Sequence, residues 1–302
     1  MRLAEIERRV ASMQELQRIV GAMRAIASMR MQEAVRALAS VREYGGALAE
    51  AIHDALAITA GQSHLAESDS YGSRNMHSNR VPVRQAGKRA IVLFASEHGF
   101  VGGFNQRLIE VVESDLLTTD ALMIVGSRGA AVAAEDGHCV TWEHPLATRL
   151  AGIADTVRLV EEALLSWIAR GEIVRAEVVF SRDRRSGELV IERRRLLPIE
   201  LTAARGPRRR LMPLHDLPAP QLLEGLTAEY MLAQLTEAAT EALAAENAAR
   251  FAAMESARDN VGRKLRTQRL DASRSRQEEV TNELLELVTG EQSLEERSTS
   301  PR

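Results

Sequence analysis

The sequence holds a single cysteine, Cys139, among 302 residues, and only 3% of its residues are aromatic. One cysteine excludes an internal disulfide. Aromatic side chains bury the most area each, so a large globular core normally uses more of them. Hydrophobic residues nevertheless make up 45% of the chain. This composition predicts that much of the apolar surface belongs to helices that pack on helices through Ala, Leu, Met and Val.

Strong net charge and long apolar runs are also missing. The net charge is −3, which favours neither a nucleic acid nor a membrane surface as a partner. No apolar run approaches the roughly 20 residues of a membrane-spanning helix. The N-terminal residues lack the apolar core of a secretory signal. We therefore expect a soluble, intracellular protein without direct membrane insertion.

Proline is absent from two long stretches, of which the first covers residues 1–58 and the second begins after Pro220. Its apolar side chains recur at a mean step of about 3.4 residues, close to the 3.5-residue period of a left-handed coiled coil. The pattern predicts a coiled-coil helix, which Gly21 and the pair Gly45–Gly46 weaken. The apolar positions are Leu3, Ile6, Val10, Met13, Leu16, Val20, Met23 and Ala27.

The second proline-poor stretch predicts a C-terminal coiled-coil helix over residues 220–290, with Gly290 as a candidate C-cap. The polar tail 291–302 is expected to be disordered. A Gly-, Ser- and Asn-rich segment, 59–87, predicts a flexible linker, and the proline-rich segment 206–219 predicts an extended connection. The apolar positions of the C-terminal helix are Leu226, Tyr230, Leu243, Met254, Ala257, Val261 and Leu265.

Residues 88–205 alternate between strand and helix patterns. Strands are expected at 89–96, 121–126 and 139–144, and a hairpin at 176–182 and 188–201. Strand–helix alternation predicts a parallel sheet covered by helices, and the hairpin predicts an antiparallel edge. The fold class is therefore α/β, with a small, mostly parallel domain between two long helices.

The two long helices are expected to pair with each other in antiparallel fashion. At 1.5 Å per residue they would be roughly 84 Å and 105 Å long, whereas a domain of about 120 residues has a radius of gyration near 14 Å. The domain cannot cover them, and bare apolar stripes of that length would aggregate. One helix enters the domain and the other leaves it, so they run in opposite directions.

The sequence offers no complete catalytic, cofactor-binding or metal-binding constellation. A Gly-rich turn at 99–105 follows the first strand, but it is not a G-x-G-x-x-G motif, and no acidic residue ends the second strand. The glycines are better explained by a tight turn and close packing. His138, Cys139 and His144 are not expected to converge on a metal, because neighbouring strand residues point to opposite faces. We therefore expect no cofactor and no metal.

Two polar features remain. The arginine clusters at 182–185, 193–195 and 208–210 lack interleaved aromatics, which favours a solvated or protein-docking face over nucleic acid. Residues 268–279 interrupt the apolar stripe of the last helix and are polar on nearly every face. The stripe resumes beyond them, so a partner is expected to surround an apolar tip formed by Val280, Leu284, Leu287 and Val288.

Residues in three regions stand in a characteristic order and spacing. The C-terminal set is Glu246, Ala249, Arg250, Met254, Asp259, Asn260, Arg276, Gln277, Thr281, Glu283, Leu284, Glu286, Val288 and Gly290. The N-terminal set is Ile6, Arg9, Val10, Ser12, Gln17, Ile19, Ala22, Met23 and Ala27. Together they resemble the γ subunit, the central rotating stalk, of F-type ATP synthases. Residues 96–105 resemble that family's S-D-R-G-L-C-G-G-x-N stretch, and 126–129 its G-x-K-G.

The resemblance implies an antiparallel coiled coil that carries a Rossmann-like domain and turns inside a ring of α and β subunits. Ion flow through the membrane c-ring would drive this rotation, and ATP would be made or hydrolysed in the β subunits. The chain itself would then not be an enzyme. The α, β and ε subunits and the c-ring would be its partners, at the cytoplasmic face of the bacterial inner membrane. In the family, the pair that matches Arg276 and Gln277 meets a β-subunit loop that catches the stalk.

The chain departs from the family pattern at a few positions. Arg258 replaces a Thr, Ala272–Ser273 replaces Tyr-Asn, and Glu97–His98 replaces Asp-Arg. These changes predict a divergent member, and an alternative bacterial F-type ATPase is one candidate class. The competing hypothesis is a stand-alone coiled-coil adaptor whose Rossmann-like module binds a nucleotide or nucleic acid itself.

Overall fold

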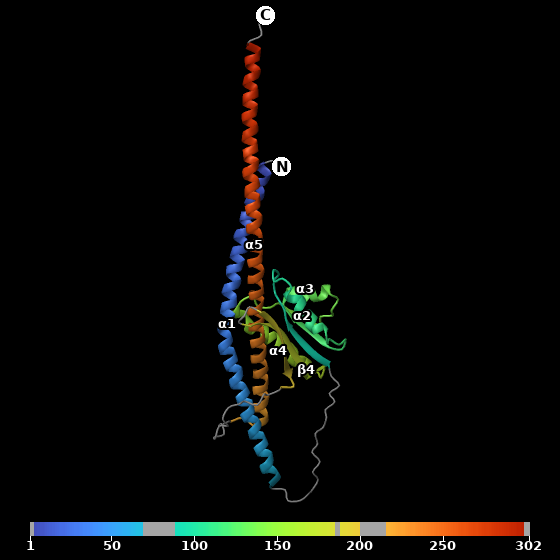
Figure 1. The fold of residues 1–302 in the computed structure, drawn as a ribbon. Coiled ribbons are helices and arrows are strands. Elements are labelled where there is room, and N and C mark those ends of the chain that lie inside the picture. Colours follow the sequence, from blue (N-terminus) through green and yellow to red (C-terminus); the bar gives the residue numbers. More distant parts are fainter. Residues whose placement is uncertain (1–2, 69–87, 185–187, 200–215, 299–302) are drawn as a thin grey trace. The chain divides into compact units, whose positions relative to one another are not determined.

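The computed structural model describes residues 3–68, 88–184, 188–199 and 216–298. The chain divides into two compact units: Met1–Ile26 with Phe251–Arg302 form unit 1, and Ala27–Arg250 form unit 2. Two long helices, α1 (Leu3–Ser68) and α5 (Ala219–Ser298), contribute to both units (Figure 1).

Both long helices extend further than the sequence patterns predicted. α1 continues to Ser68, so residues 59–68 are helical rather than part of a linker, and 69–87 lie outside the described residues. α5 passes through Gly290 and ends at Ser298, so Gly290 is not its C-cap. A helical glycine costs only about 1 kcal/mol relative to Ala. Neither extension contains a proline, the residue that ends a helix most strongly.

In unit 1, the side of α1 that packs on α5 follows a strict coiled-coil spacing. Ile6 and Val20 are buried, and Gln17 and Arg24 are half-buried, whereas the predicted seam residue Leu16 is 42% exposed. The contact face of α1 therefore includes two polar residues, Gln17 and Arg24. A search for regularly spaced apolar residues does not find them. The α5 residues on the opposite side are Met254, Val261 and Leu265, all buried.

Side-chain contacts show that α1 and α5 run antiparallel within each unit. In unit 1, Arg24 Nη1 lies 2.6 Å from Glu255 Oε2. The guanidinium of Arg276 lies 2.6 Å from Glu7. In unit 2, Arg42 Nε donates to Glu237 Oε1 at 3.0 Å. In the same unit, the Tyr44 hydroxyl donates to Glu229 Oε1 at 2.5 Å. In each unit, the α1 residue number therefore falls as the α5 number rises, as antiparallel pairing requires.

The strands of unit 2 form one five-stranded sheet in the order β3-β2-β1-β4-β5. β1 pairs in parallel with β2 and β4, β2 pairs in parallel with β3, and β5 is antiparallel to β4. The predicted parallel sheet with an antiparallel edge hairpin is therefore confirmed. The strands are β1 (Lys88–Phe94), β2 (Ala121–Val125), β3 (Trp142–His144), β4 (Ile173–Arg184) and β5 (Glu188–Leu197).

Helices cover both faces of this sheet (Figure 1). α2 (Phe104–Glu113) and α3 (Ser127–Glu135) pack on one face, where the core contains Leu93, Leu108 and Ile124. On the other face lie η1 (Leu150–Gly152), α4 (Ile153–Ala169) and the part of α5 that contains Leu235.

The middle of α5 forms part of the core of unit 2. Residues 238–247 are all buried, because the sheet, α4 and α1 surround this stretch of helix. Its alanines, among them Ala238, Ala242 and Ala245, allow the neighbouring backbones to approach closely. The predicted fold class is confirmed: long N- and C-terminal helices carry a small, mostly parallel α/β domain.

Candidate functional site

The Gly-rich loop that follows β1 closes on itself through two buried polar residues. The Ser96 backbone N–H donates to Asn105 Oδ1 at 3.0 Å, and Asn105 Nδ2 donates to Ser96 Oγ at 2.8 Å. Both side chains are buried, so each has its hydrogen-bonding groups satisfied by the other. These bonds fix where the loop leaves β1 and where α2 begins.

Glu97 occupies the position in this loop at which a bound anion would be expected. Its carboxylate accepts hydrogen bonds from the Ser127 backbone N–H at 2.9 Å and the Ser127 hydroxyl at 2.9 Å. It also accepts one from the Leu146 backbone N–H at 2.8 Å. Free N–H groups at a helix start are what bind phosphate in nucleotide folds. Here the N-terminus of α3 is already paired with the chain's own carboxylate.

Two glycines at the start of α3 allow close backbone packing. Gly126 has a φ of 128°, and a Cβ there would lie 2.5 Å from the Ala95 carbonyl oxygen. A Cβ on Gly129 would lie 2.1 Å from Ala95 Cβ. Any side chain at these two positions would push α3 away from β1.

The glycines of the 99–105 turn differ: Gly102 has the positive φ of 59° that a tight turn requires, but a Cβ on Gly99, Gly102 or Gly103 would meet nothing within 4 Å. The tight turn predicted there is confirmed, and the predicted close packing is wrong.

A buried ion pair joins the loop to α5, and we call it the loop clamp: Glu246 and Arg250 with the loop residues Glu97, His98 and Gly99. The Arg250 guanidinium donates to Glu246 Oε1, to the His98 carbonyl at 3.2 Å and to the Gly99 carbonyl at 3.4 Å. The Glu97 backbone N–H donates to Glu246 Oε2 at 3.4 Å. Glu246 and Arg250 are only 3% and 7% exposed. A buried charge pair with added hydrogen bonds is directional in a way that apolar packing is not.

The predicted contact residues Arg276 and Gln277 lie in unit 1, near the start of α1. The Arg276 guanidinium donates to Glu7 Oε1 at 2.6 Å, and both side chains remain about half exposed or more. Gln277 lines a shallow surface hollow with Arg274 and Thr281. A further protein thus has access to both residues in unit 1.

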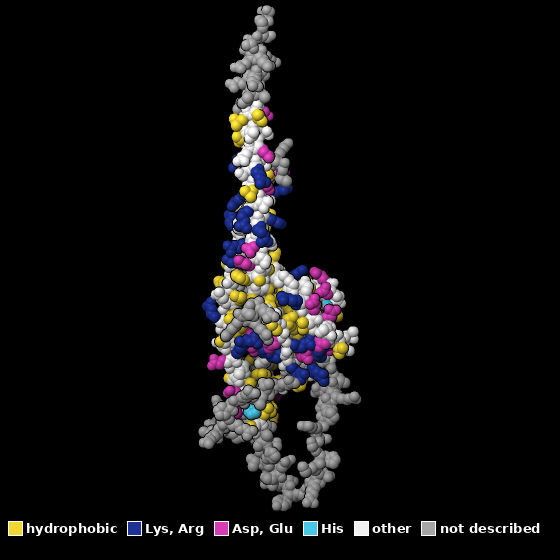
Figure 2. Space-filling view, in the orientation of Figure 1, with side chains coloured by type: hydrophobic (Ala, Val, Ile, Leu, Met, Phe, Trp, Pro, Cys, Tyr) yellow, Lys and Arg dark blue, Asp and Glu magenta, His cyan; other side chains and the backbone are white. Residues whose placement is uncertain are grey.

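The predicted apolar tip comes directly after Gln277 on α5. Val280 is 50% exposed and Leu284 is 57% exposed. Every described side chain from 276 to 286 is exposed. Figure 2 shows hydrophobic side chains on this part of α5, past the start of α1. Leu287 and Val288 lie on α5, but their side chains are outside the described residues.

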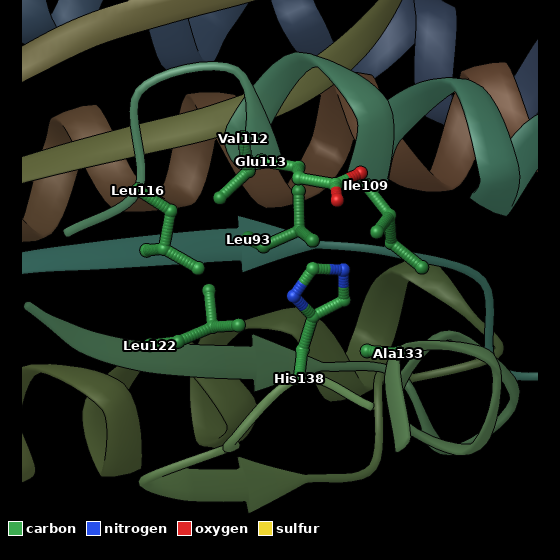
Figure 3. Close-up of a pocket in the computed structure, with 8 residues that line it drawn as sticks. All are labelled: Leu93, Ile109, Val112, Glu113, Leu116, Leu122, Ala133 and His138. Atoms are coloured by element: carbon green, nitrogen blue, oxygen red, sulfur yellow. The ribbon is translucent and has the colours of Figure 1, made fainter. Parts of the chain in front are cut away.

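The three residues considered for a metal site serve separate purposes. His138 points into a small apolar crevice between α2 and the sheet, beside Glu113 and Leu116 (Figure 3). The crevice volume of about 10 Å³ is room for at most one water. Cys139 is exposed, and His144 stacks on Trp142. Across the described residues, no group of three His, Cys, Asp or Glu side chains is placed to hold a metal ion.

The arginine clusters on the β4–β5 hairpin are engaged in ion pairs. Arg182 and Arg194 both pair with carboxylates of α5, and Arg193 pairs with Asp115 at 2.5 Å. The cluster at 208–210 lies outside the described residues. On the hairpin, these arginines face the chain's own acidic residues, which the sequence alone did not reveal because the pairs join residues far apart in sequence.

The arrangement defines a class of protein in which two long antiparallel helices carry an α/β domain. The Gly-rich loop of that domain is hydrogen-bonded to α5 through the loop clamp. A family model described as ATP synthase matches residues 2–294. The chain therefore belongs to this ATP synthase family. No helix among the described residues has the length and hydrophobicity to cross a membrane.

Individual relatives agree with the family. The chain is 28% identical over 305 residues to the ATP synthase gamma chain of Frankia casuarinae, with 97% of each chain covered. It resembles a chain in the mitochondrial ATP synthase OSCP, F1 and c-ring assembly of Euglena gracilis, with a TM-score of 0.63, 12% identity and coverage of 99% and 97%. It also resembles a chain in the central stalk and c-ring of Tetrahymena thermophila mitochondrial ATP synthase, with a TM-score of 0.52, 16% identity and coverage of 79% and 99%. At these identities the solved structures establish the shared fold.

Proposed function

We propose that this chain transmits torque as the central stalk of a rotary ATP synthase, turning inside its own ring of catalytic subunits. The γ subunit of this family is a rotor and is non-catalytic, so the chain supplies rotation and asymmetry rather than an active site. Catalysis then belongs to partner subunits.

The observation that supports this proposal most strongly is that α5 extends beyond the N-terminal end of α1, the helix it pairs with in unit 1. The Arg276–Glu7 pair marks the level at which α1 begins, and α5 continues to Ser298. Beyond this pair, exposed Val280 and Leu284 have the apolar character of residues that another protein buries. A ring that encloses the end of α5 would bury them and still let the helix turn, because apolar contacts have no preferred direction.

Arg276 and Gln277 are proposed to meet a loop of the β subunit that catches the stalk. A guanidinium presents five donors in a planar fork, which suits carboxylates and backbone carbonyls on a passing loop. Glu7 holds Arg276 through one exposed contact. An exposed ion pair contributes only about 0–1 kcal/mol, so a partner carboxylate can replace Glu7 at little cost.

The α and β subunits of the catalytic ring, the ε subunit and the membrane c-ring are the proposed partners. The solved neighbours come from assemblies that contain F1 and a c-ring. We place the chain at the cytoplasmic face of a bacterial inner membrane, as a peripheral subunit. ATP synthesis coupled to proton or other ion transport would follow from these contacts.

Co-expression tests the proposal. The chain would be produced with the α and β subunits of the same organism, and the control would be the same α and β subunits without it. We expect a stable complex that contains the chain and hydrolyses ATP faster than the control. Failure of the chain to co-purify, or a hydrolysis rate that its presence does not change, would refute the stalk assignment.

A further inference from the structure

Two carboxylates of α5 in unit 2 are each shared by arginines from two other elements. Glu237 pairs with Arg42 of α1 at 3.0 Å and with Arg194 of β5 at 2.8 Å. Glu241 pairs with the same Arg42 and with Arg182 of β4, whose Nε lies 3.4 Å away. We call these five residues the shared-carboxylate joint.

The joint is partly buried and well supported. The side chains of Glu241 and Glu237 are only 4% and 13% exposed. Arg194 also donates to Gln234 Oε1 at 2.7 Å, and its guanidinium lies 5.4 Å from the centroid of the Phe180 ring. Glu192 pairs with Arg194 at 2.6 Å and with Arg182 at 3.4 Å, which ties the two strands of the hairpin together.

Stability alone does not explain such a joint. Removing carboxylates from water is expensive, and well-packed apolar residues in their place are often neutral or stabilising. The surrounding contacts of this region are apolar and small, among them Ala34, Ala238 and Ala242. Such contacts resist separation but have no preferred direction. The joint adds charge-assisted hydrogen bonds, whose geometry opposes sliding and twisting.

The topology of the joint suggests what it resists. Glu237 and Glu241 are four residues apart and lie one above the other on α5. Arg42 of α1 reaches both of them, and one arginine of the hairpin reaches each. Movement of α1 along or around α5 therefore breaks contacts to both carboxylates. Movement of the β4–β5 hairpin breaks the contact of Arg194 with Glu237 and that of Arg182 with Glu241.

We propose that the shared-carboxylate joint is the point at which the α/β domain and both long helices are fixed together against torque, with Arg42 as the positioning residue that fixes α1. The proposal rests on the stalk function proposed above, since torque between the domain and the helices arises only in a turning stalk. The loop clamp holds α5 alone, whereas the joint holds α1 and α5 to the same hairpin.

The test uses the assembled complex, with its catalytic ring fixed to a surface and a bead attached through exposed Cys139, the only cysteine of the chain. The other subunits would carry no reactive cysteine. Cys139 lies in the α/β domain, so torque from the ring must cross from the helices into the domain to turn the bead. Rotation would be measured with a small probe and against a magnetic load.

Arg42→Met keeps the length of the side chain and removes its charge. We expect a loss of stall torque under load and an unchanged rotation rate with the small probe. Arg182→Met should give a smaller loss, because Arg42 still holds Glu241. The matched control is Arg158→Met, which removes an ion pair of 2.5 Å to Glu162 that lies within α4 and joins no two elements. It should leave both readouts unchanged.

The outcomes separate the two proposals. Absence of rotation by the unmodified complex would refute the stalk function itself. Normal rotation, with the same stall torque for Arg42→Met as for Arg158→Met, would overturn the joint alone. If Arg42→Met does not assemble, Arg42→Lys replaces it, because a lysine keeps the charge but lacks the fork that holds two carboxylates. Full stall torque in Arg42→Lys would equally overturn the joint.

Discussion

At the scale of single residues, the junction between β1 and α3 depends on the absence of two side chains. Gly126 combines a positive φ with a position where a Cβ would lie 2.5 Å from the Ala95 carbonyl oxygen, and a Cβ on Gly129 would overlap the Ala95 side chain. In the sequence these positions appear only as a G-x-R-G pattern, which carries no packing signal of its own. The α3 N-terminus that they precede is paired with Glu97.

Replacement of Gly126 by Ala should destabilise the chain by about 2–4 kcal/mol, because the new Cβ is both strained and overpacked. The matched control is Gly46→Ala in α1, where a Cβ meets nothing within 4 Å. That change should stabilise by about 0.5–1 kcal/mol. Urea unfolding at submicromolar chain concentration measures both. A Gly126→Ala chain as stable as the wild type would contradict the close packing at β1.

The charge of Asp115 should make the stability depend on pH in the acid range. Hydrogen bonds from Arg193 and then Arg89 lower the pKa of Asp115 from 3.8 to about 2. A lowered pKa in the folded state means that the contribution is complete above about pH 4 and is lost as the pH falls towards 2. The Asp115 side chain is 42% exposed, so the contribution should stay below about 1 kcal/mol.

Urea unfolding from pH 7 to pH 3 of the wild type, of Asp115→Asn and of the control Asp136→Asn at the end of α3 checks this expectation. The difference between Asp115→Asn and wild type should shrink as the pH falls below about 4. A difference that stays constant from pH 7 to pH 3 would show that the arginines do not act through the charge of Asp115.

Sequence reasoning succeeded where a residue acts through its own local pattern and failed where it acts through a distant partner. The tight turn at 99–105 needed only a local glycine pattern, and Gly102 has the expected positive φ. The close packing expected of the same glycines occurs instead at Gly126 and Gly129.

The roles of Arg42 and Glu241 gave no signal, and Glu97 stood out only as a departure from the family pattern, because a single charged residue acquires its role from partners up to 199 positions away. The sequence pattern placed Leu16 rather than Gln17 on the face of α1 that packs on α5. Only apolar residues were considered for that face, so a polar contact residue was missed.

At the scale of elements, α5 passes through three environments. Residues 238–247 are buried all round in unit 2, Val261 and Leu265 are buried on one side in unit 1, and residues 276–286 are exposed. The helix itself was predictable from its composition and from the absence of proline after Pro220 in its first turn. Its end was not, because Gly290 resembles a C-cap but costs too little to stop a long helix.

The double change Arg276→Ala with Gln277→Ala tests the proposed catch on α5. We expect normal assembly, with a fall in ATP hydrolysis by the complex and in ion-driven ATP synthesis in membranes. Stability should change by no more than about 0.5 kcal/mol, as for other surface substitutions. Arg266→Ala, at an exposed α5 position, is the control. Unchanged rates in the fully assembled double variant would remove both residues from the functional site.

The exposed end of α5 should make the isolated chain self-associate. Val280 and Leu284 have about half of their surface in water, and contiguous apolar surface of this kind promotes association. Sedimentation velocity at increasing chain concentration should show oligomers. A chain that ends at Glu279 should form fewer oligomers at the same concentrations. Identical sedimentation of the two chains would mean that the tip needs no partner.

At the scale of the whole molecule, the pairing of the long helices could be predicted from how much apolar surface the α/β domain can bury. Two helices too long for the domain to bury had to pair with each other, and two side-chain contacts between them in each unit show antiparallel pairing. The functional site was less accessible, because the partners that would use Arg276, Gln277 and the tip are other proteins. The apolar pattern indicated that a partner surrounds the tip, whereas only the resemblance to a family suggested a role for Arg276 and Gln277. All of these roles stay predictions.

Rotation is the most direct test of the central claim that this chain is a torque-transmitting stalk. The complex with its own α and β subunits would be fixed through the ring, with a small probe attached at Cys139, which is exposed. On addition of ATP, we expect continuous rotation of the probe in one direction, at a rate that follows ATP hydrolysis. A complex that hydrolyses ATP at full rate while the probe only fluctuates about a fixed angle would contradict it.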